Sequence, residues 1–152
     1  MKKGILLILV SILVLSCNSD DDSSEVVVIE STLIAKSILS GAGDEGIVQQ
    51  NSVITDQNTW NNLITQMNTV NNVSDSFSEI DIDFSEFTVI AVFDEVKATG
   101  GYSLELDIMS NSVNIIVNIT HVVPTGGGVT TALTQPYYIV KIPVTDLPII
   151  FE

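Results

Sequence analysis

Hydrophobic and polar residues alternate most regularly between residues 99 and 143. Over 102–108 apolar side chains take every second position and polar side chains take the positions between them, a period that predicts a strand with one buried face. The same alternation resumes over 113–120 after the turn residues 110–112, so these two runs predict an antiparallel hairpin. The run 135–143 is aromatic, β-branched and bracketed by prolines, and it predicts a third strand.

Upstream of the hairpin the pattern predicts one helix and one central strand. Asp56 is expected to cap a helix over 57–69, because its carboxylate can accept hydrogen bonds from exposed backbone donors. That helix would present one apolar stripe to the core, with Trp60 as an anchor: Trp60, Leu63, Ile64 and Met67. Residues 87–93 are almost continuously apolar, which favours a strand covered by sheet on one side and by the helix on the other.

Shorter apolar runs predict further strands at 26–29, 33–35 and 47–54, and a short edge or tail at 147–151. The fold class expected is therefore α+β: a small, mostly antiparallel β-sheet with one helix (about 57–69) packed on it. The 152 residues have room for one such domain, which we place at 26–152.

Acids and hydrophobic residues alternate over 78–84, which predicts a strand with Glu79, Asp81 and Asp83 on one face. Such oxygen ligands suit calcium. However, the sequence lacks the glycine and the closing glutamate of an EF-hand loop, so a solvated strand face is the favoured interpretation and the cation remains an open alternative.

The N-terminal residues have the features of a secretion signal followed by a lipid anchor. Two lysines precede an apolar stretch over 5–15, which is shorter than the roughly 20 residues that span a bilayer. Residues 14–17, Val-Leu-Ser-Cys, resemble a bacterial lipobox, so we expect a signal peptide over 1–16 and lipidation of Cys17. The alternative is a secreted protein without lipid, in which the cysteine lies at the cleavage site by chance.

Residues 17–25 form an acidic, hydrophilic segment that is expected to act as a tether. The serine and aspartates after the cysteine resemble the surface-export signal of one large group of Gram-negative lipoproteins. That resemblance implies a protein anchored in the outer membrane and exposed on the cell surface. An acidic spacer that keeps the domain away from the lipid is the alternative.

Charge restricts the classes of partner. The full sequence has a net charge of −14 and no arginine, and loss of Lys2 and Lys3 with the leader makes the mature chain two charges more negative. Nucleic acid is therefore excluded as a partner, and membrane contact is expected through the lipid alone. A cationic protein surface remains compatible with this charge.

The remaining polar positions do not form a known catalytic or cofactor motif. The only histidine is His121 and the only cysteine is Cys17, so a disulfide within the chain and a thiolate metal cluster are excluded. The chain has no nucleophile elbow, and the glycines at 126–128 lack the Lys-Ser/Thr of a phosphate loop. We therefore expect no catalytic residue, no cofactor and no metal, and we interpret 126–134 as a contact loop.

One segment resembles a known family. Thr-Gly-Gly-Tyr-Ser at 99–103, the hairpin, Val-Pro at 123–124 and the strand that begins with Pro136-Tyr137 occur in an order similar to that of the C-terminal domain of the protease complex subunit PrcB family. The likeness is sharpest over 97–143 and extends more loosely to Asp83, giving a PrcB-like region of about 83–143. It implies a small α+β module of bacterial envelope proteins without catalytic residues, whose founding member is a lipoprotein that associates with a secreted protease.

Two functions are compatible with these observations, and an enzyme is a distant third. The first is a non-enzymatic outer-membrane lipoprotein that acts as an accessory or binding module for another envelope protein, such as a secreted protease. The second is a cell-surface receptor for a small molecule or glycan, in which Tyr102, Tyr137 and Tyr138 would stack on sugars. The residues predicted to contact a protein partner are Gly100, Gly101, Tyr102, Gly126, Gly127, Gly128 and Tyr137.

Overall fold

The computed structural model describes residues 26–126 and 130–152. The predicted signal peptide, Cys17, the acidic tether, Gly127 and Gly128 lie outside the described residues. Within the described ranges, no helix is both long and apolar enough to cross a membrane.

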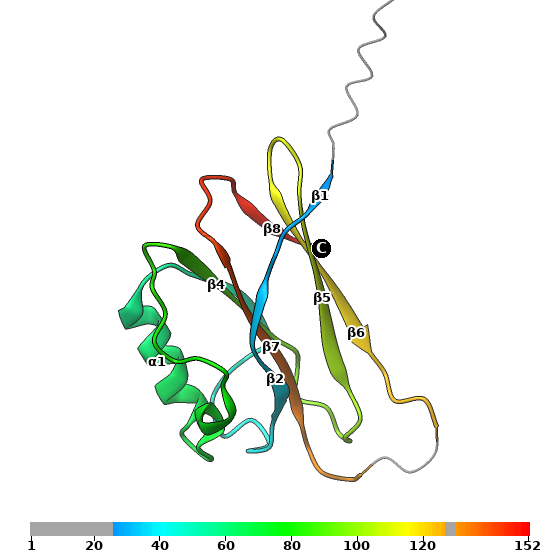
Figure 1. Cartoon of the computed structure of the whole chain (residues 1–152). Helices are drawn as coiled ribbons and strands as arrows, with labels where there is room; N and C mark the ends of the chain where they lie inside the picture. The colour runs from blue at the N-terminus through cyan, green and yellow to red at the C-terminus, as the bar shows by residue number, and fades with distance from the viewer. Residues whose placement is uncertain (1–25, 127–129) are drawn as a thin grey trace, which may run out of the picture.

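Two four-stranded sheets and one α-helix make up the fold (Figure 1). The hairpin sheet has the order β1-β5-β6-β8, and the helix-bearing sheet has the order β2-β7-β4-β3. All pairings within these sheets are antiparallel except that of β6 with β8. The element bounds are β1 Val27–Val28, β2 Thr32–Leu39, β3 Gln50–Ile54, α1 Gln57–Met67, a 3₁₀ turn η1 Val73–Ser76, β4 Phe87–Phe93, β5 Ser103–Ser110, β6 Ile115–Val122, β7 Gln135–Pro143 and β8 Ile149–Phe151.

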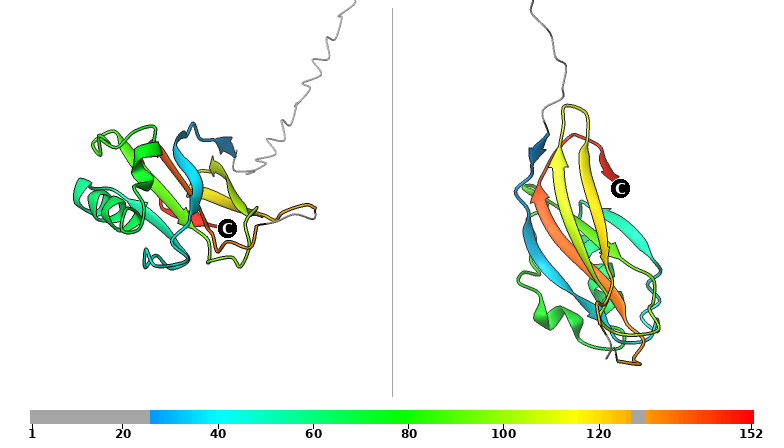
Figure 2. Two further views of the ribbon diagram at one scale, coloured as in Figure 1. Left: turned by 90° about the horizontal axis from the view of Figure 1, so that it is seen from below. Right: turned by 90° about the vertical axis from the view of Figure 1, so that its right-hand side faces the viewer.

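The α+β class is confirmed, but the single sheet that we expected is divided into two. The hairpin β5–β6 pairs within one sheet, while β4 and β7 pair within the other. The two sheets pack face to face, as the view from below on the left of Figure 2 shows. The alternating pattern predicts a buried face for each strand, but it does not specify whether strands share a ladder or pack across a core.

The predicted hairpin is confirmed with its expected faces. Leu104 and Ile108 of β5 are buried, as are Ile115 and Val117 of β6, while the polar residues between them are more exposed. Val113, which the pattern placed on the apolar face, is 61% exposed, because it lies in the turn that precedes β6.

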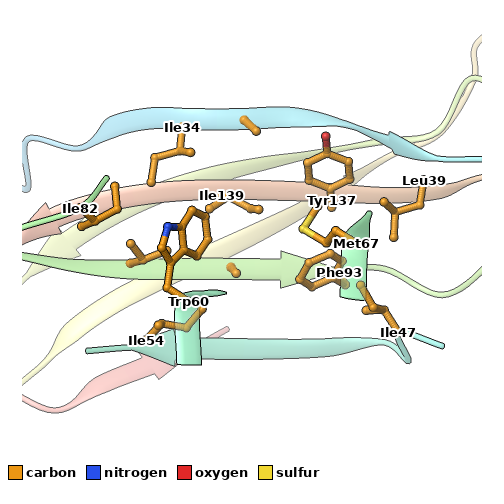
Figure 3. Packing of buried hydrophobic residues seen from close by; sticks show 13 residues of the cluster. Ile34, Leu39, Ile47, Ile54, Trp60, Met67, Ile82, Phe93, Tyr137 and Ile139 are labelled. Atoms are coloured by element: carbon orange, nitrogen blue, oxygen red, sulfur yellow. The ribbon is translucent and has the colours of Figure 1, made fainter. Parts of the chain in front are cut away.

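Strand β4 is covered on both faces, as predicted. Val89, Ala91 and Phe93 face the core beneath α1, and Ile90 and Val92 face the core between the two sheets. Figure 3 shows the first of these cores, in which Trp60 of α1 lies over the helix-bearing sheet. The uninterrupted apolar run of β4 is explained by these two cores, since neither face of the strand meets water.

Helix α1 begins as the sequence predicts and ends two residues earlier. Asp56 caps it by accepting a hydrogen bond from the Thr59 backbone N–H at 2.9 Å. Trp60 is fully buried and its indole N–H donates to the Ile80 carbonyl at 2.8 Å. The helix ends at Met67 because Asn68 is the C-cap and its side chain exchanges hydrogen bonds with Ser74 of η1.

The strand predicted over 78–84 is wrong. This segment has no ladder partner, and it crosses beside β2 with the Ser78 N–H donating to the Ile34 carbonyl at 3.0 Å. Glu79 forms an ion pair with Lys141, whereas Asp83 accepts from the Ser85 N–H. Glu79 and Asp83 therefore have different partners, and no group of three potential metal ligands occurs among the described residues.

Candidate binding surface at the loop end of the sheets

Two loops far apart in sequence are joined at one end of the molecule. The backbone of Lys97 exchanges hydrogen bonds with that of Thr134, at 2.7 and 3.1 Å, and the Gly100 N–H donates to the Thr130 carbonyl at 3.1 Å. The Thr134 hydroxyl donates to the carbonyl of Thr99 at 3.0 Å. We call the described residues of these loops, 95–102, 123–126 and 130–134, the loop end.

The buried carboxylate of Asp94 supports the loop end from beneath. Asp94 follows β4 directly, is 1% exposed, and accepts hydrogen bonds from the backbone N–H of Glu95 at 2.8 Å and from Nδ1 of His121 at 3.0 Å. The Lys97 ammonium lies 3.1 Å from the same carboxylate oxygen that His121 contacts. One side chain therefore ties together the end of β4, the end of β6 and the loop that carries Lys97.

The network sets the protonation of its members. Burial by itself raises the pKa of Asp94, but hydrogen bonds from His121, the Glu95 N–H and Lys97 together outweigh burial and hold that pKa below its ordinary value of 3.8. Burial likewise lowers the pKa of Lys97, and its contacts with Glu95 and Asp94 more than compensate, so that pKa is raised. Asp94 is consequently an anion that accepts, and the Nδ1 of His121 carries the hydrogen.

The backbone of Asp94 is held as firmly as its side chain. Its N–H donates to the Pro136 carbonyl at 2.9 Å, and its carbonyl accepts from the amide of Gln135 at 2.8 Å. The same amide nitrogen donates to the Ile47 carbonyl at 2.9 Å. Buried polar groups that are paired in this way give a rigid base to the loops above them.

Glycines allow the two loops to approach each other. A Cβ at Gly100 would lie 2.4 Å from the Thr130 hydroxyl oxygen, so the contact between the loops requires glycine there. Gly101 has a φ of 91°, in the region that favours glycine. Beside them the Lys97 ammonium lies 5.4 Å from the centre of the Tyr102 ring, in cation–π contact.

The predicted contact residues are distributed unequally over this surface. Gly101 and Gly126 are exposed, Tyr102 is half-buried, and Gly100 is buried against Thr130. Tyr137 is 0% exposed and packs on Phe93 with the ring centres 6.0 Å apart, so it cannot touch a partner and is corrected to a core residue. It is buried because this position of β7 faces the core beneath α1.

The three tyrosines proposed as a sugar platform do not share a face. Tyr137 faces the core under α1, while Tyr138 faces the core between the sheets and packs against Lys36. Tyr102 lies at the loop end beside Lys97. Neighbouring residues of a strand point to opposite faces, so Tyr137 and Tyr138 cannot stack on one ligand.

A hollow of about 220 Å³ lies next to His121, between β3 and the end of β6. The residues that line it include Gln49, Gln50, Val92 and Ile119. An Asp–His pair of this kind can orient an imidazole for proton transfer. Among the described residues, however, no hydroxyl or thiol is hydrogen-bonded to His121. The hollow therefore has polar groups that could bind a ligand, but no nucleophile is held next to the imidazole.

The network around Asp94 is not predicted by the sequence analysis, which considers His121 only as the sole histidine and does not single out Asp94. The available signal was an acid placed immediately after a strand with two buried faces, since a carboxylate there needs partners.

The comparisons with known proteins agree with the resemblance found in the sequence. The family model described as PrcB C-terminal matches residues 88–143, which run from β4 through the hairpin to the end of β7. The PrcB resemblance is thus confirmed over this segment, which contains Asp94, Lys97, His121 and both loops. No curated protein and no solved structure matches the chain.

Proposed function

We propose that this protein is a non-enzymatic accessory module that docks another envelope protein, such as a secreted protease, through its loop end. The match of residues 88–143 to the PrcB C-terminal model supports a role in association with a protease complex. In this proposal Cys17 carries the lipid that anchors the protein in the outer membrane, and the acidic tether presents the domain at the cell surface.

The observation that carries the proposal is that exposed apolar residues lie on loops with a rigid base. Val96, Val123 and Leu133 are all large, exposed hydrophobic residues, and all three belong to the loop end. The loops that bear them are fastened to each other and to the buried Asp94. Exposed apolar residues grouped on a fixed framework are typical of a protein interaction site.

Charge indicates what surrounds the apolar contact on the partner. Each of the three lysines among the described residues is already in an ion pair: Lys36 with Glu105, Lys97 with Asp94 and Glu95, and Lys141 with Glu79. The remaining surface is therefore dominated by carboxylates that lack a cation from this chain. The loop end itself contains one acid, Glu95, which Lys97 already pairs, so a partner with an apolar contact patch fits it best, and the net negative charge of the chain favours a cationic surface around that patch.

Crosslinking on intact cells that express the affinity-tagged full chain tests the docking role. We expect recovery of one dominant envelope protein, and we expect the double substitution Val123→Ser and Leu133→Ser to lower that recovery about tenfold, because interface anchors carry most of the binding energy. Val113→Ser is the matched control, since Val113 is equally apolar and exposed but lies at the opposite end of the hairpin. Equal recovery with all variants would contradict docking through the loop end.

The anchor has its own test. Cells fed a labelled fatty acid should label the full chain and should fail to label Cys17→Ser, which is also expected to leave the membrane fraction. Protease added to intact cells should remove the domain if it faces outward and leave it intact if it faces the periplasm.

A further inference from the structure

The four outer edges of the two sheets differ in how well they are protected against pairing with another strand. β1 and β8 are only two and three residues long, and β2 carries Lys36 and a register shift between Leu33 and Ala35. Charges, bulges and short length are the usual means of blocking an edge. β3 has none of these protections: it has five residues, no charge, no proline and an unbroken register with β4.

The outward backbone groups of β3 are available. β3 pairs with β4 on one side only, and alternate residues of any strand direct their N–H and C=O groups to the opposite side. Within the part of the chain that the structure describes, no hydrogen bond engages those outward groups. Val53 is 40% exposed on this edge.

A groove of about 380 Å³ runs between β3 and α1. Gln50, Ser52 and Val53 line it from the strand, and Asn62, Leu63 and Gln66 line it from the helix. Side-chain amides both donate and accept hydrogen bonds, so those of Gln50 and Asn62 can pair with the peptide groups of an incoming chain, whereas the Gln66 amide already donates to the Gly46 carbonyl at 3.0 Å. In Figure 3, β3 lies at the lower margin of the sheet with Ile54 close to Trp60.

The surroundings of this groove are almost without charge. Residues 47–74 include eleven asparagines and glutamines and a single ionisable residue, Asp56, in a chain that has 19 acids. The Asp56 carboxylate is occupied in capping α1, where it accepts from both the N–H and the hydroxyl of Thr59. A segment that docks here meets little like-charge repulsion and no counter-ion, so the face selects for uncharged sequence.

From these observations we propose that β3 is a docking edge, on which an uncharged, extended segment of a partner protein adds as a fifth strand of the helix-bearing sheet. Its backbone pairs with β3, and its alternate side chains, which are small, hydroxylic or amide-bearing, enter the groove beside α1. The inference rests on the proposed function in taking the partner to be a protein and in taking each chain to be anchored in one membrane, and this site is separate from the loop end.

A second copy of this chain fits the edge less well. Antiparallel pairing of β3 with its own copy would place the two β1 strands at opposite ends of the dimer (Figure 1). If each chain is anchored at its N-terminal side in one membrane, as the proposed function has it, such a dimer would turn the two domains in opposite directions relative to that membrane. We therefore take the partner strand to come from another protein.

A selection of displayed peptides against the purified, intact protein tests this inference. The probe is a library of random linear peptides, and we expect enrichment of uncharged peptides with strand-forming alternation. Enriched peptides, synthesised with blocked ends, should slow hydrogen exchange of β3 amides and should lose affinity about tenfold or more with Val53→Lys, because a charged side chain blocks an edge.

Ile38→Lys is the matched control. Ile38 is 39% exposed, against 40% for Val53, and lies on the opposite edge of the same sheet. Peptides that bind wild type, Val53→Lys and Ile38→Lys equally would overturn the proposal, as would the absence of any enrichment. A protein that is dimeric in solution, with its β3 amides protected before peptide is added, would assign the edge to a second copy and would also overturn it. None of these results bears on the loop end, which is tested by its own variants.

Discussion

The carboxylate of Asp94 accepts a hydrogen bond from Nδ1 of His121 at 3.0 Å, although 27 positions separate the two residues. Asp94 follows β4 of the helix-bearing sheet and His121 lies in β6 of the hairpin sheet. The contact therefore joins the two sheets beneath the loop end. Because the same carboxylate also holds Lys97, the position of the loops depends on one buried charge.

Asp94→Asn is expected to lower the free energy of unfolding by about 1.5–3 kcal/mol at pH 7, the usual range for a hydrogen bond to a charged group. The amide keeps the size of the side chain but removes the anion that Lys97 and His121 face. Urea unfolding followed by circular dichroism measures the difference. Glu95→Gln is the control, since Glu95 is exposed and its ion pair with Lys97 should contribute little.

The effect of Asp94 should depend on pH in a defined direction. Its pKa is lower in the folded protein than the ordinary 3.8, so its contribution to stability is fully present above 3.8 and is lost as the pH falls through the folded value. The difference in stability between wild type and Asp94→Asn should therefore be largest near neutrality and should shrink below pH 3.8. A difference that stays constant from neutral to acidic pH would contradict the ionised network.

Tyr137→Phe is expected to leave stability unchanged or to raise it by up to about 1 kcal/mol. The Tyr137 hydroxyl is buried and makes no hydrogen bond of good geometry among the described residues, although the hydroxyls of Ser76 and Ser37 lie near it, so its removal breaks no well-formed hydrogen bond. The ring contacts with Phe93 and Phe77 are retained by phenylalanine. Thermal and urea unfolding measure the change, and a loss of more than about 1 kcal/mol would mean that the hydroxyl is hydrogen-bonded after all.

The contact between the two loops can be tested by a double-mutant cycle. Gly100→Ala places a methyl group against the Thr130 hydroxyl, and we expect a loss of about 1–3 kcal/mol, typical of overpacking. Thr130→Ala should recover most of that loss, because it removes the atom that the methyl group meets. Gly101→Ala is the control: its cost comes from a positive φ, and Thr130→Ala should not relieve it. Additive losses at Gly100 and Thr130 would show that the loops are not in contact.

Trp60→Phe is expected to lower the free energy of unfolding by about 1–3 kcal/mol, since it removes the hydrogen bond to the Ile80 carbonyl and leaves unfilled volume under α1. The segment 78–84 should become more mobile, which hydrogen exchange can detect. Thr65→Ala, on the exposed side of α1, should change stability little. If Trp60→Phe left the exchange of 78–84 unaltered, that hydrogen bond would not be what holds the segment in place.

Local patterns determined much of this protein from the sequence alone. Strand periodicity predicted the β5–β6 hairpin and β7, helical spacing predicted the stripe of Trp60 and Met67, and the Asp56 cap set the start of α1. These features depend on residues within a few positions of one another, where the geometry of the backbone is decisive. The order of short motifs along the chain was also sufficient to indicate the PrcB resemblance.

Tertiary structure alone decided the features that depend on distant partners. The alternation over 78–84 predicted a strand. In the folded protein the segment instead makes contacts with the Trp60 indole, the Ile34 carbonyl and Lys141, and it pairs with no strand. Tyr137 was predicted to contact a partner because the sequence does not show that both faces of β7 are covered. The pairing of Asp94 with His121 was also inaccessible from sequence. A buried charge selects its partners by proximity in the folded chain, and spacing along the sequence carries no record of that proximity.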